Sequence, residues 1–533
     1  MRAFAILLDR LSYMPSRLGK LELLKSYFRS TPDPDRGFAL AALSDEMPVK
    51  VPLRRIITEL SKDKFHPYLF GLSRDYVGDS AETLALIWPR GETNQNPPFL
   101  HEIIEILKLL KVAEIASVIG KWLDQCNSIE RWALLKFLSG ASRVGVSARL
   151  AKTALADAFG ADLHDIEEMW HGVSPPYLAL FAWLEGKGDK PISSGVPVFK
   201  PLMLSNPLED QVRDTIDISE FAVEWKWDGI RVQFSRSGGV TKLFSRSGDD
   251  ISATFPELVA DQTFDGVLDG ELLVMQNNIV ASFSDLQQRL NRKTVTATML
   301  KKFPAHIRLY DALQLDGEDL RNLTFDERRK CLEHWFEKYQ SHHTDLSPLL
   351  TIKDKSELLN LWSNIRNEGI EGLMLKRRAS AYLQGRQQGH WYKWKRSPLV
   401  ADCVLLYAQR GAGKRSSFYS DYTFGAWKDE DEARVLVPVG KAYSGFTDEE
   451  LRKIDRFIRE NTIQKFGPVR SVKPELVFEV AFDAVNISSR HKSGVAMRFP
   501  RISRIRWDKP AAEADTLNHL LTLVEDRQAN SLK

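Results

Sequence analysis

The chain has 533 residues, of which 43% are hydrophobic and 27% charged, and its formal net charge at pH 7 is +3. This length exceeds one hydrophobic core and predicts roughly two to four domains. No apolar run reaches the roughly eighteen residues of a membrane-spanning helix, and so small a net charge neither favours nor excludes a nucleic-acid partner. Cys126, Cys331 and Cys403 are scattered without a CxxC pair, which favours a reducing cytoplasm over a zinc ribbon or a disulfide framework.

Up to about Trp183 the apolar residues recur at helical spacing. In residues 101–126, HEIIEILKLLKVAEIASVIGKWLDQC, they return every three or four positions, which predicts one buried helix face. SIERWALLKFLSG repeats this pattern, with Ser128 as the predicted N-cap and Gly140 near the end. The apolar start contains Asp9 and lacks a small-residue cleavage site, so it predicts a helix rather than a signal peptide. An all-α domain is predicted over residues 1–190.

A change in residue composition and pattern marks the next domain. GKGDKPISSGVPVFKPLM is rich in Gly, Pro and Ser and predicts a linker. VQFSRSGGVTKLFSRSG predicts two strands joined by a Gly-Gly turn. GVLDGELLVM and HIRLYDALQL also read as strands, whereas SFSDLQQRLNRK and TFDERRKCLEHWFEKYQ read as helices. A mixed α+β domain is therefore predicted over residues 200–397.

The region after Pro398 contains several predicted strands and one predicted helix around TDEELRKIDRFIREN. Strands in this proportion favour a small β-barrel, and an OB-fold over residues 398–533 is the leading prediction. Only the end, RQANSLK, is expected to be a frayed tail.

The stretch FAVEWKWDGIRVQF places Lys226 between two tryptophans and directly before an Asp-Gly turn. Alone, Lys-x-Asp-Gly favours an ordinary surface lysine beside a hairpin. Further charged residues follow within the same domain and in strand-like surroundings: Glu271, Glu371, Lys376, Lys393 and Lys395. Carboxylates among apolar strand residues are costly unless paired or metal-bound, and Mg²⁺ prefers a few carboxylates with phosphate oxygens. Together these residues predict a nucleotide site.

A lysine amine attacks phosphorus only when it is unprotonated. Crowding by Lys393 and Lys395, with partial burial between the tryptophans, is expected to depress the pKa of Lys226. The same cations would stabilise charge on an α-phosphate and on departing pyrophosphate. Lys226 is thus predicted to be a covalent nucleophile that carries a nucleotide.

With these motifs in place, the chain resembles the ATP-dependent DNA ligases, which belong to the covalent nucleotidyltransferases. The resemblance follows EWKWDGIR, LFSRSGDD, LDGELL, RLYDALQLDGEDL, EGLMLK, WYKWKR and RFPRISRIRWDKP in order. It implies that Lys226 is adenylated and that Glu271 and Glu371 bind the metal. The nucleotide contacts that it implies are Glu224 and Tyr310 at the adenine, Arg231, Arg246, Glu271 near the ribose, Arg386, Lys393 and Lys395 at the α-phosphate, and Arg498 and Lys509 for pyrophosphate release.

The resemblance extends to the helical region, which is similar to the DNA-binding domain of these ligases. In RVGVSARL a glycine turn leads to Ser147, the predicted cap of a new helix, with Arg143 and Arg149 beside it. A helix N-terminus flanked by arginines suits binding of the DNA backbone without sequence preference. The alternative is an ordinary joint between helices with solvated arginines.

The implied reaction has three steps. Lys226 takes AMP from ATP, the AMP passes to the 5′-phosphate of a nick in duplex DNA, and the adjacent 3′-hydroxyl seals the strand. Mg²⁺, or Mn²⁺ in its place, would assist, and the OB domain is expected to rotate about a hinge at Lys395–Pro398. The expected protein is a monomer without membrane contact, serving DNA replication, repair or recombination. The absence of a targeting signal or long extension favours a cytoplasmic protein of bacterial or archaeal source, acting at the nucleoid.

Alternatives remain at this level. An RNA ligase or a capping-type guanylyltransferase would use the same lysine chemistry, and GTP dependence would reveal the latter. An NAD-dependent ligase is disfavoured because no zinc cysteines follow the OB region. A non-catalytic DNA-binding scaffold would fail to label with ATP.

Overall fold

The computed structural model describes the chain except for residues 50, 90–95, 141, 192–194, 261, 291, 293, 340, 365–368, 397, 412–418, 431–432, 444–446, 489–490 and 532–533. It forms two compact units. One comprises Met1–Leu163, Ser174–Asp189 and Pro398–Glu525, and the other comprises His164–Val173, Lys190–Ser397 and Asp526–Lys533. Ser397, inside the predicted hinge, lies outside the described residues. No helix in the described part of the chain is long and apolar enough to cross a membrane.

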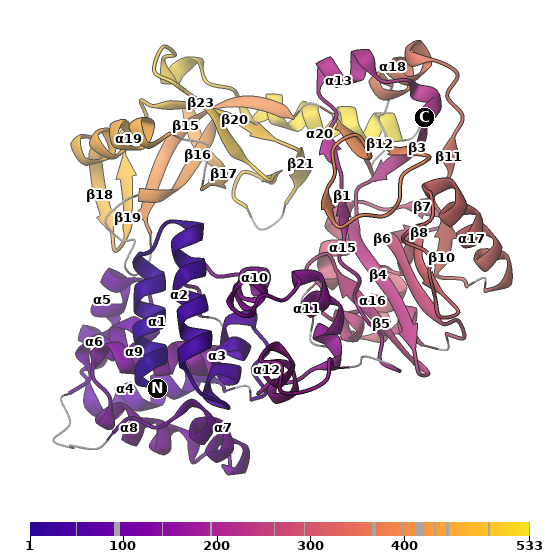
Figure 1. Ribbon diagram of the computed structural model, residues 1–533. Coiled ribbons are helices and arrows are strands. Elements are labelled where there is room, and N and C mark those ends of the chain that lie inside the picture. Colours follow the sequence, from indigo (N-terminus) through magenta and orange to yellow (C-terminus); the bar gives the residue numbers. More distant parts are fainter. Residues whose placement is uncertain are drawn as a thin grey trace. The chain divides into compact units, whose positions relative to one another are not determined.

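The region up to Leu184 is helical, as predicted (Figure 1). Its helices are α1 (Arg2–Tyr13), α2 (Arg17–Ser30), α3 (Asp35–Ser44), α4 (Leu53–Lys64), α5 (Pro67–Val77), α6 (Ser80–Ile87), α7 (Leu100–Leu109), α8 (Ile115–Gln125), α9 (Ser128–Ser139), α10 (Ala148–Phe159), α11 (Leu163–Met169), the 3₁₀ turn η1 (Trp170–Gly172) and α12 (Leu178–Leu184). Apolar residues of α1, α2, α3 and α9 are fully buried against one another and form the core of this region.

Two details of the helical prediction are wrong. The single helix face predicted over 101–126 is divided between α7 and α8, because Leu110 is extended and the Glu114 carboxylate accepts the Lys111 backbone N–H at 2.9 Å. That bond caps a new turn, which the apolar spacing alone does not reveal. Asn127, rather than Ser128, caps α9, and Glu130 bonds back to the Asn127 N–H in a reciprocal capping box.

The second unit contains two main sheets. The larger has the strand order β10-β8-β6-β4-β5, and the smaller has the order β11-β3-β12-β14-β2. The bounds are β2 (Asn206–Pro207), β3 (Phe221–Trp227), β4 (Ile230–Ser237), β5 (Val240–Ser245), β6 (Gly266–Gln276), β8 (Ala305–Leu315), β10 (Thr344–Leu346), β11 (Leu349–Leu350), β12 (Ile370–Arg377) and β14 (Trp391–Lys395). β7 (Ile279–Val280) and β9 (Glu318–Asp319) pair with β6 and β8, while β1 (Met203–Leu204) pairs with β13 (Gly385–Arg386). The predicted α+β domain is confirmed.

Helices cover both sheets. They are α13 (Asp210–Thr215), η2 (Ile218–Glu220), η3 (Ser252–Thr254), α14 (Pro256–Val259), α15 (Phe283–Arg289), α16 (Ala297–Lys302), α17 (Phe325–Lys338) and α18 (Lys355–Ser363). Leu332 and Trp335 of α17 belong to the core of the larger sheet, whereas Leu358 of α18 belongs to that of the smaller. Gly238 and Gly239 both have positive φ, 56° and 82°, and close the predicted β4–β5 hairpin.

The short helix α11 also belongs to this unit. Glu168 pairs with Arg321 at 2.7 Å, and Glu167 accepts a hydrogen bond from Gln384. Further along, the Gln233 amide bonds both the N–H and the C=O of Lys200, at 2.7 and 2.8 Å. The end of the predicted linker is therefore fixed to the sheet.

The C-terminal region is a curled antiparallel half-barrel of OB type, as predicted. β15 (Leu399–Arg410) lies at its centre and pairs with β16 (Tyr419–Glu430), β19 (Val469–Val472) and β20 (Val477–Phe482). The remaining elements are β17 (Ala433–Ala442), α19 (Asp448–Glu460), β18 (Thr462–Phe466), β21 (Ala484–Ile487), β22 (Val495–Arg498), β23 (Arg501–Arg506), the 3₁₀ turn η5 (Ala511–Glu513) and α20 (Leu517–Ser531). Ile454 and Ile458 of α19 are fully buried in the barrel core.

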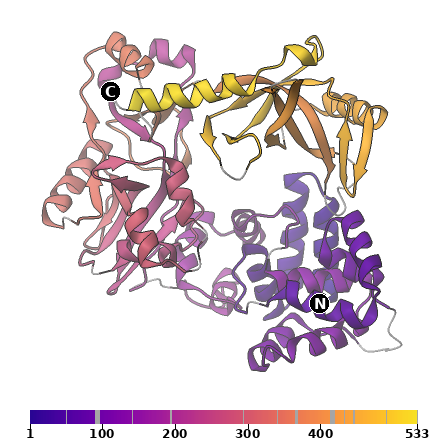
Figure 2. The same ribbon diagram turned by 180° about the vertical axis from the view of Figure 1, so that it is seen from behind.

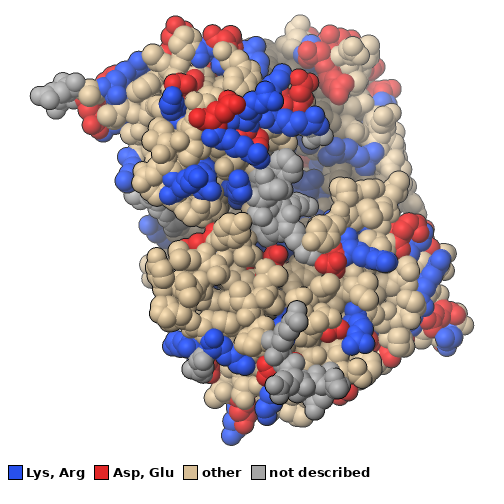
Figure 3. Space-filling model, turned by 90° about the vertical axis from the view of Figure 1, so that its left-hand side faces the viewer, with Lys and Arg blue, Asp and Glu red and all other residues tan. Residues whose placement is uncertain are grey.

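The far end differs from the sequence prediction. Residues 527–531 of the segment expected to be frayed lie in α20, which continues as one helix to Ser531 (Figure 2). On another face, Lys and Arg side chains are numerous, with acidic ones between them, over the part of the surface that carries α19 (Figure 3). The basic residues of α19 are Arg452, Lys453, Arg456 and Arg459.

Candidate active site

A two-residue connection places Lys226 where the smaller sheet gives way to the larger. β3 ends at Trp227 and β4 begins at Ile230, while the Asp228 N–H donates to the Gly369 carbonyl at 2.7 Å. A Cβ on Gly229 would collide with the Leu272 carbonyl oxygen of β6, so only glycine fits this turn. The Asp-Gly that follows the lysine is therefore required by the crossing between sheets.

The side chain of Lys226 forms an ion pair that the sequence did not reveal. Its Nζ lies 2.5 Å from Glu371 Oε2, and Lys395 Nζ lies 3.2 Å from the same oxygen. Burial would raise the pKa of Glu371, but the Lys226 and Lys395 ammonium groups hold it at about 2. Glu371 is thus ionised at neutral pH and joins two residues that the sequence predicted in one site.

Lys393 lies in the same group of cations. Burial lowers its pKa, and the charges of Arg386, Lys395, Lys226 and Arg246 lower it further. Arg246 follows β5 and Arg386 ends β13, and both side chains are exposed. The predicted crowding of basic residues is therefore present, whereas the predicted lowering of the nucleophile's pKa stays a prediction.

Glu271 has the opposite character to Glu371. Burial raises its pKa to about 7, the carboxylates of Glu371 and Asp228 raise it, and the cations Lys226 and Arg231 lower it. In the sheet, Glu271 of β6 is the register partner of Arg231 of β4. One carboxyl of this cluster is thus fully charged at neutral pH, and the other is close to half-charged.

The carboxyl groups of Glu271 and Glu371 fit a Mg²⁺ ion that binds together with the phosphates of a substrate. Within the described ranges, no three His, Cys, Asp or Glu side chains are arranged to hold an ion by themselves. Mg²⁺ commonly takes one or two protein carboxylates and completes its shell with phosphate oxygens and water. A cation would also relieve the electrostatic cost of ionising Glu271 beside Glu371.

The residues predicted to bind the base form a second, buried cluster. Glu224 is 1% exposed, and its carboxylate lies 2.5 Å from Lys376 Nζ and 3.7 Å from an Arg329 nitrogen. The Lys376 ammonium also lies 4.2 Å from the centroid of the Tyr310 ring. Lys376, which the sequence grouped with the phosphate-binding lysines, is instead the ion-pair partner of Glu224.

Arg231 is held by two residues that the sequence analysis missed. Its guanidinium lies 2.6 Å from Asp269 Oδ2 and donates to the Tyr382 hydroxyl at 2.9 Å and to the Met203 carbonyl at 2.6 Å. Asp269 is the aspartate of LDGELL, so a signal for it stood two residues before Glu271. Tyr382 lies in a segment without regular structure and carries no such signal.

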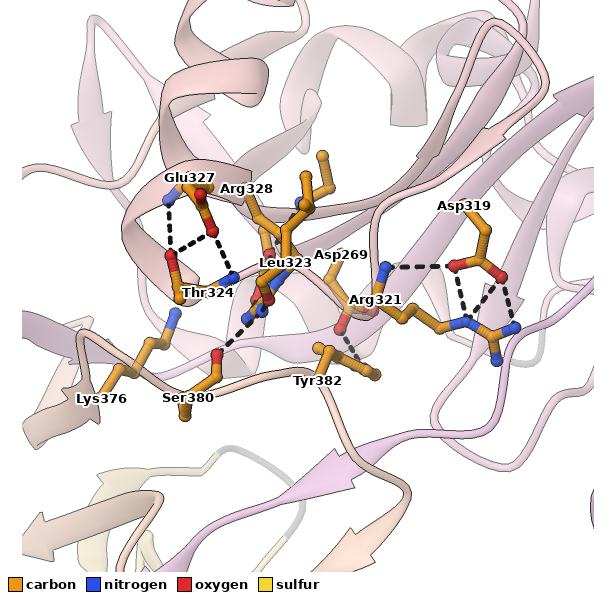
Figure 4. A network of polar contacts seen from close by, with 12 residues as sticks. Asp269, Asp319, Arg321, Leu323, Thr324, Glu327, Arg328, Lys376, Ser380 and Tyr382 are labelled. Atoms are coloured by element: carbon orange, nitrogen blue, oxygen red, sulfur yellow. Dashed lines mark hydrogen bonds and ion pairs between the residues drawn. The ribbon is translucent and has the colours of Figure 1, made fainter.

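A wider polar network supports this cluster (Figure 4). Arg328 of α17 makes a bidentate ion pair with Asp311 at 2.8 and 2.9 Å, with both side chains fully buried. Its remaining nitrogen donates to the carbonyls of Leu323 and Ser380 at 2.7 and 3.0 Å. The network ties α17 to the chain segment that precedes Tyr382.

The two predicted residues of the C-terminal region lie on separate elements. Arg498 ends β22, and its guanidinium carbon lies 5.1 Å from the centroid of the Phe499 ring. Lys509 Nζ lies 2.7 Å from Asp402 Oδ2, which Arg506 also approaches at 3.2 Å. Their predicted roles stay predictions.

The predicted glycine turn and helix cap at Ser147 are confirmed, whereas DNA binding there stays a prediction. Ser147 caps α10 by accepting the Leu150 N–H at 3.2 Å, and Arg143 and Arg149 are exposed on either side. Lys20 of α2 is nearly buried, at 7% exposed, and its ammonium donates to the carbonyls of Val144 and Gly145 at 2.9 and 3.0 Å. These hydrogen bonds fix the turn to α2.

Comparisons with known proteins agree with this geometry. The model of the ATP dependent DNA ligase domain matches residues 202–395, and that of the ATP dependent DNA ligase C terminal region matches residues 415–509. A probable DNA ligase of Koribacter versatilis is 35% identical over 74% of this chain and 72% of its own length. DNA ligase 1 of Korarchaeum cryptofilum is 29% identical over 98% of both chains. A solved structure described as Pmar-Lig_Pre. covers 95% of this chain and 99% of its own with a TM-score of 0.60, at 17% identity, which supports the fold alone.

Proposed function

The chain belongs to the ATP-dependent DNA ligases, and on that premise we propose that Lys226 is the residue that takes AMP from ATP. The observation that carries the proposal is that the Lys226 and Lys395 ammonium groups share one Glu371 carboxylate oxygen, with the Lys226 charge also acting on Lys393. Nζ attacks the α-phosphorus, a P–N bond forms, and the P–O bond to pyrophosphate breaks. The amine must shed a proton for this attack.

The ion pair with Glu371 describes a resting arrangement. The Glu371 carboxylate lies 2.5 Å from the Lys226 amine and engages it in this arrangement. When Mg²⁺ is bound at Glu371 and Glu271, it supplies charge neutralisation for the phosphates.

We give the other site residues the roles that the resemblance implies. Glu224 and Tyr310 would contact adenine, Arg231 would lie near the nucleotide, Glu271 would lie near the ribose, and Lys393 and Lys395 would bind the α-phosphate. Arg246 and Arg386 would add positive charge at the exposed side of the phosphates. Arg498 and Lys509 would assist pyrophosphate release after rotation about a hinge at Lys395–Pro398. The domain limits 1–190, 200–397 and 398–533 belong to the same proposal.

The second and third steps use the same bound AMP. The 5′-phosphate at a nick in duplex DNA attacks the lysyl-AMP, and the 3′-hydroxyl then displaces AMP and closes the strand. Arg143, Ser147 and Arg149 would hold the DNA backbone, because exposed arginines beside a capped helix start bind phosphates without reading bases. A monomer supplies every part of this reaction. We place the protein in the cytoplasm of a bacterium or archaeon.

The test is the intact mass of the protein after removal of bound AMP with pyrophosphate and incubation with Mg²⁺ and ATP, GTP or NAD in turn. An AMP-sized increase with ATP is expected for the wild type. It should be absent in Lys226→Ala and retained in Lys242→Ala, a matched change on β5 at a lysine paired with Asp250. A GMP adduct would overturn the nucleotide assignment, and an adduct on Lys226→Ala would overturn the nucleophile.

A further inference from the structure

The Tyr382 hydroxyl forms a cluster of three polar groups with the side chains of Asp269 and Arg231, beside the proposed nucleotide site. Its hydroxyl donates to Asp269 Oδ2 at 2.6 Å and accepts from Arg231 at 2.9 Å, while Arg231 also contacts Asp269 at 2.6 Å. Tyr382 is 3% exposed and Asp269 is fully buried. The three groups therefore form a closed triangle from which water is excluded.

The triangle depends on a protonated hydroxyl. Burial and the Asp269 carboxylate raise the pKa of Tyr382 well above 10. The hydroxyl can therefore donate to a carboxylate and accept from a guanidinium at every working pH. Phenylalanine would keep the ring and lose both bonds.

The ring and backbone of Tyr382 fix where that hydroxyl lies. The ring meets Trp391 edge-on at 5.8 Å, and the guanidinium carbon of Arg328 lies 5.5 Å from its centroid. The backbone N–H donates to the Arg321 carbonyl at 2.8 Å. Figure 4 shows Tyr382 directed toward Asp269 from the segment that also carries Ser380. The hydroxyl thus has one available position.

Arg231 connects the triangle to both ends of the pocket. Its guanidinium carbon lies 6.0 Å from the centroid of the Tyr310 ring, and its charge lowers the pKa of Glu271. Without Tyr382, Arg231 would keep the Asp269 carboxylate at NH2 and the Met203 carbonyl at NH1. The Tyr382 hydroxyl bonds both members of the Arg231–Asp269 pair, so its loss would loosen the carboxylate and the guanidinium together.

We propose that Tyr382 is a positioning residue for nucleotide binding, whose hydroxyl holds the Arg231 guanidinium in place between the adenine end and the metal end of the pocket. The inference rests on the proposed function, since it requires that ATP is bound beside Lys226. Tyr382 does not touch the reacting atoms. It acts through Arg231.

The experiment compares Tyr382→Phe with Tyr422→Phe, which loses a buried hydroxyl that donates to the Tyr419 carbonyl in the C-terminal barrel. The rate of lysyl-AMP formation is measured against ATP concentration. For Tyr382→Phe the KM for ATP should rise about tenfold, the effect of losing a hydrogen bond to a charged group, with the maximal rate within about twofold of wild type. Tyr422→Phe should leave both unchanged.

A double-mutant cycle separates positioning from general stability. Tyr382→Phe should raise KM by less than about twofold when Arg231→Lys is already present, because the guanidinium that the hydroxyl holds is then absent. Equal rises in both backgrounds, or an unchanged KM in Tyr382→Phe, would overturn the proposal. If Tyr382→Phe unfolds, Asp269→Asn serves in its place, with the same non-additivity expected. Failure of the wild type itself to label with ATP would count against the proposed function instead.

Discussion

The Lys226 ammonium and the Glu371 carboxylate lie 2.5 Å apart, although the two residues stand 145 positions apart in the chain. β3 and β12 are antiparallel neighbours, and Lys226 is in register with Gly372, the residue after Glu371. A bulge between Ile370 and Gly372, where Gly372 has φ 156°, directs the carboxylate to the lysine. The pair follows from local backbone geometry.

The first prediction concerns this pair. Glu371→Gln removes the charge that Lys226 and the metal share, so lysyl-AMP formation should fall by about a hundredfold or more at saturating ATP. The rate should also depend less on Mg²⁺ concentration. Glu357→Gln on α18, an exposed carboxylate in a capping position, is the control and should keep both values. A Glu371→Gln rate within tenfold of wild type would contradict the role.

The second prediction concerns pH and Glu271. Its pKa of about 7, set by burial and opposed by Lys226 and Arg231, means that the carboxyl takes up a proton as the pH falls below 7. Metal-assisted labelling at subsaturating Mg²⁺ should therefore weaken between about pH 7.5 and 6. Stopped labelling assays across this range would show it. Glu371, with a pKa near 2, does not titrate there.

The raised pKa of Glu271 also predicts how the free energy of unfolding depends on pH. Because the folded pKa of Glu271 is raised above 4.5, its protonated form stabilises the fold below about pH 4.5, and that contribution is lost as the pH rises through 7. Glu271→Gln should therefore raise the free energy of unfolding at pH 8 by on the order of 1–3 kcal/mol, and hardly change it near pH 4.5. Urea unfolding at the two pH values measures this. A larger gain at the acid end would contradict it.

The third prediction concerns the buried Arg328–Asp311 pair. Arg328→Ala leaves the Asp311 carboxylate without its bidentate partner in a fully buried place, which should cost about 3–5 kcal/mol of unfolding free energy. Arg378→Ala breaks an exposed ion pair with Asp326, which lies on α17 like Arg328, and should cost less than about 1 kcal/mol of unfolding free energy. Denaturant unfolding distinguishes the two. Equal losses would show that the network does not depend on burial.

The fourth prediction concerns the turn before α10. Lys20→Met leaves the Val144 and Gly145 carbonyls without their donor, so the turn that presents Arg143 should loosen. Affinity for nicked duplex DNA should fall several-fold. Lys25→Met removes a partly exposed lysine, paired with Glu22 on the same helix, and should change the affinity little. Binding titrations at two salt concentrations would check this, since Arg143→Ala and Arg149→Ala should each reduce the salt slope by about one.

The sequence predicted the three regions and most elements because periodicity, glycine turns and capping residues are local signals. It also named the residues that gather around Lys226, since they lie in short motifs with strong composition. It missed the Lys226–Glu371 pair, which depends on a bulge, and Tyr382, whose partners lie 113 and 151 positions away. It grouped Lys376 with the other charged residues of the predicted nucleotide site. The spacing of residues along β12 does not show that the Lys376 side chain pairs with Glu224.

The path of the chain between the two compact units has a further consequence. The chain passes between them at 163/164, 173/174 and 189/190 on the N-terminal side, at 397/398 before the barrel, and at 525/526 within α20. A chimera that exchanges the whole chain after residue 397 with that of a relative needs one splice, at 397/398. A chimera that exchanges the helical region must instead take α11 from the same protein as the α+β domain, because Glu167 and Glu168 of α11 contact Gln384 and Arg321 of that domain. Recombination between relatives should therefore be tolerated more readily at the second border than at the first.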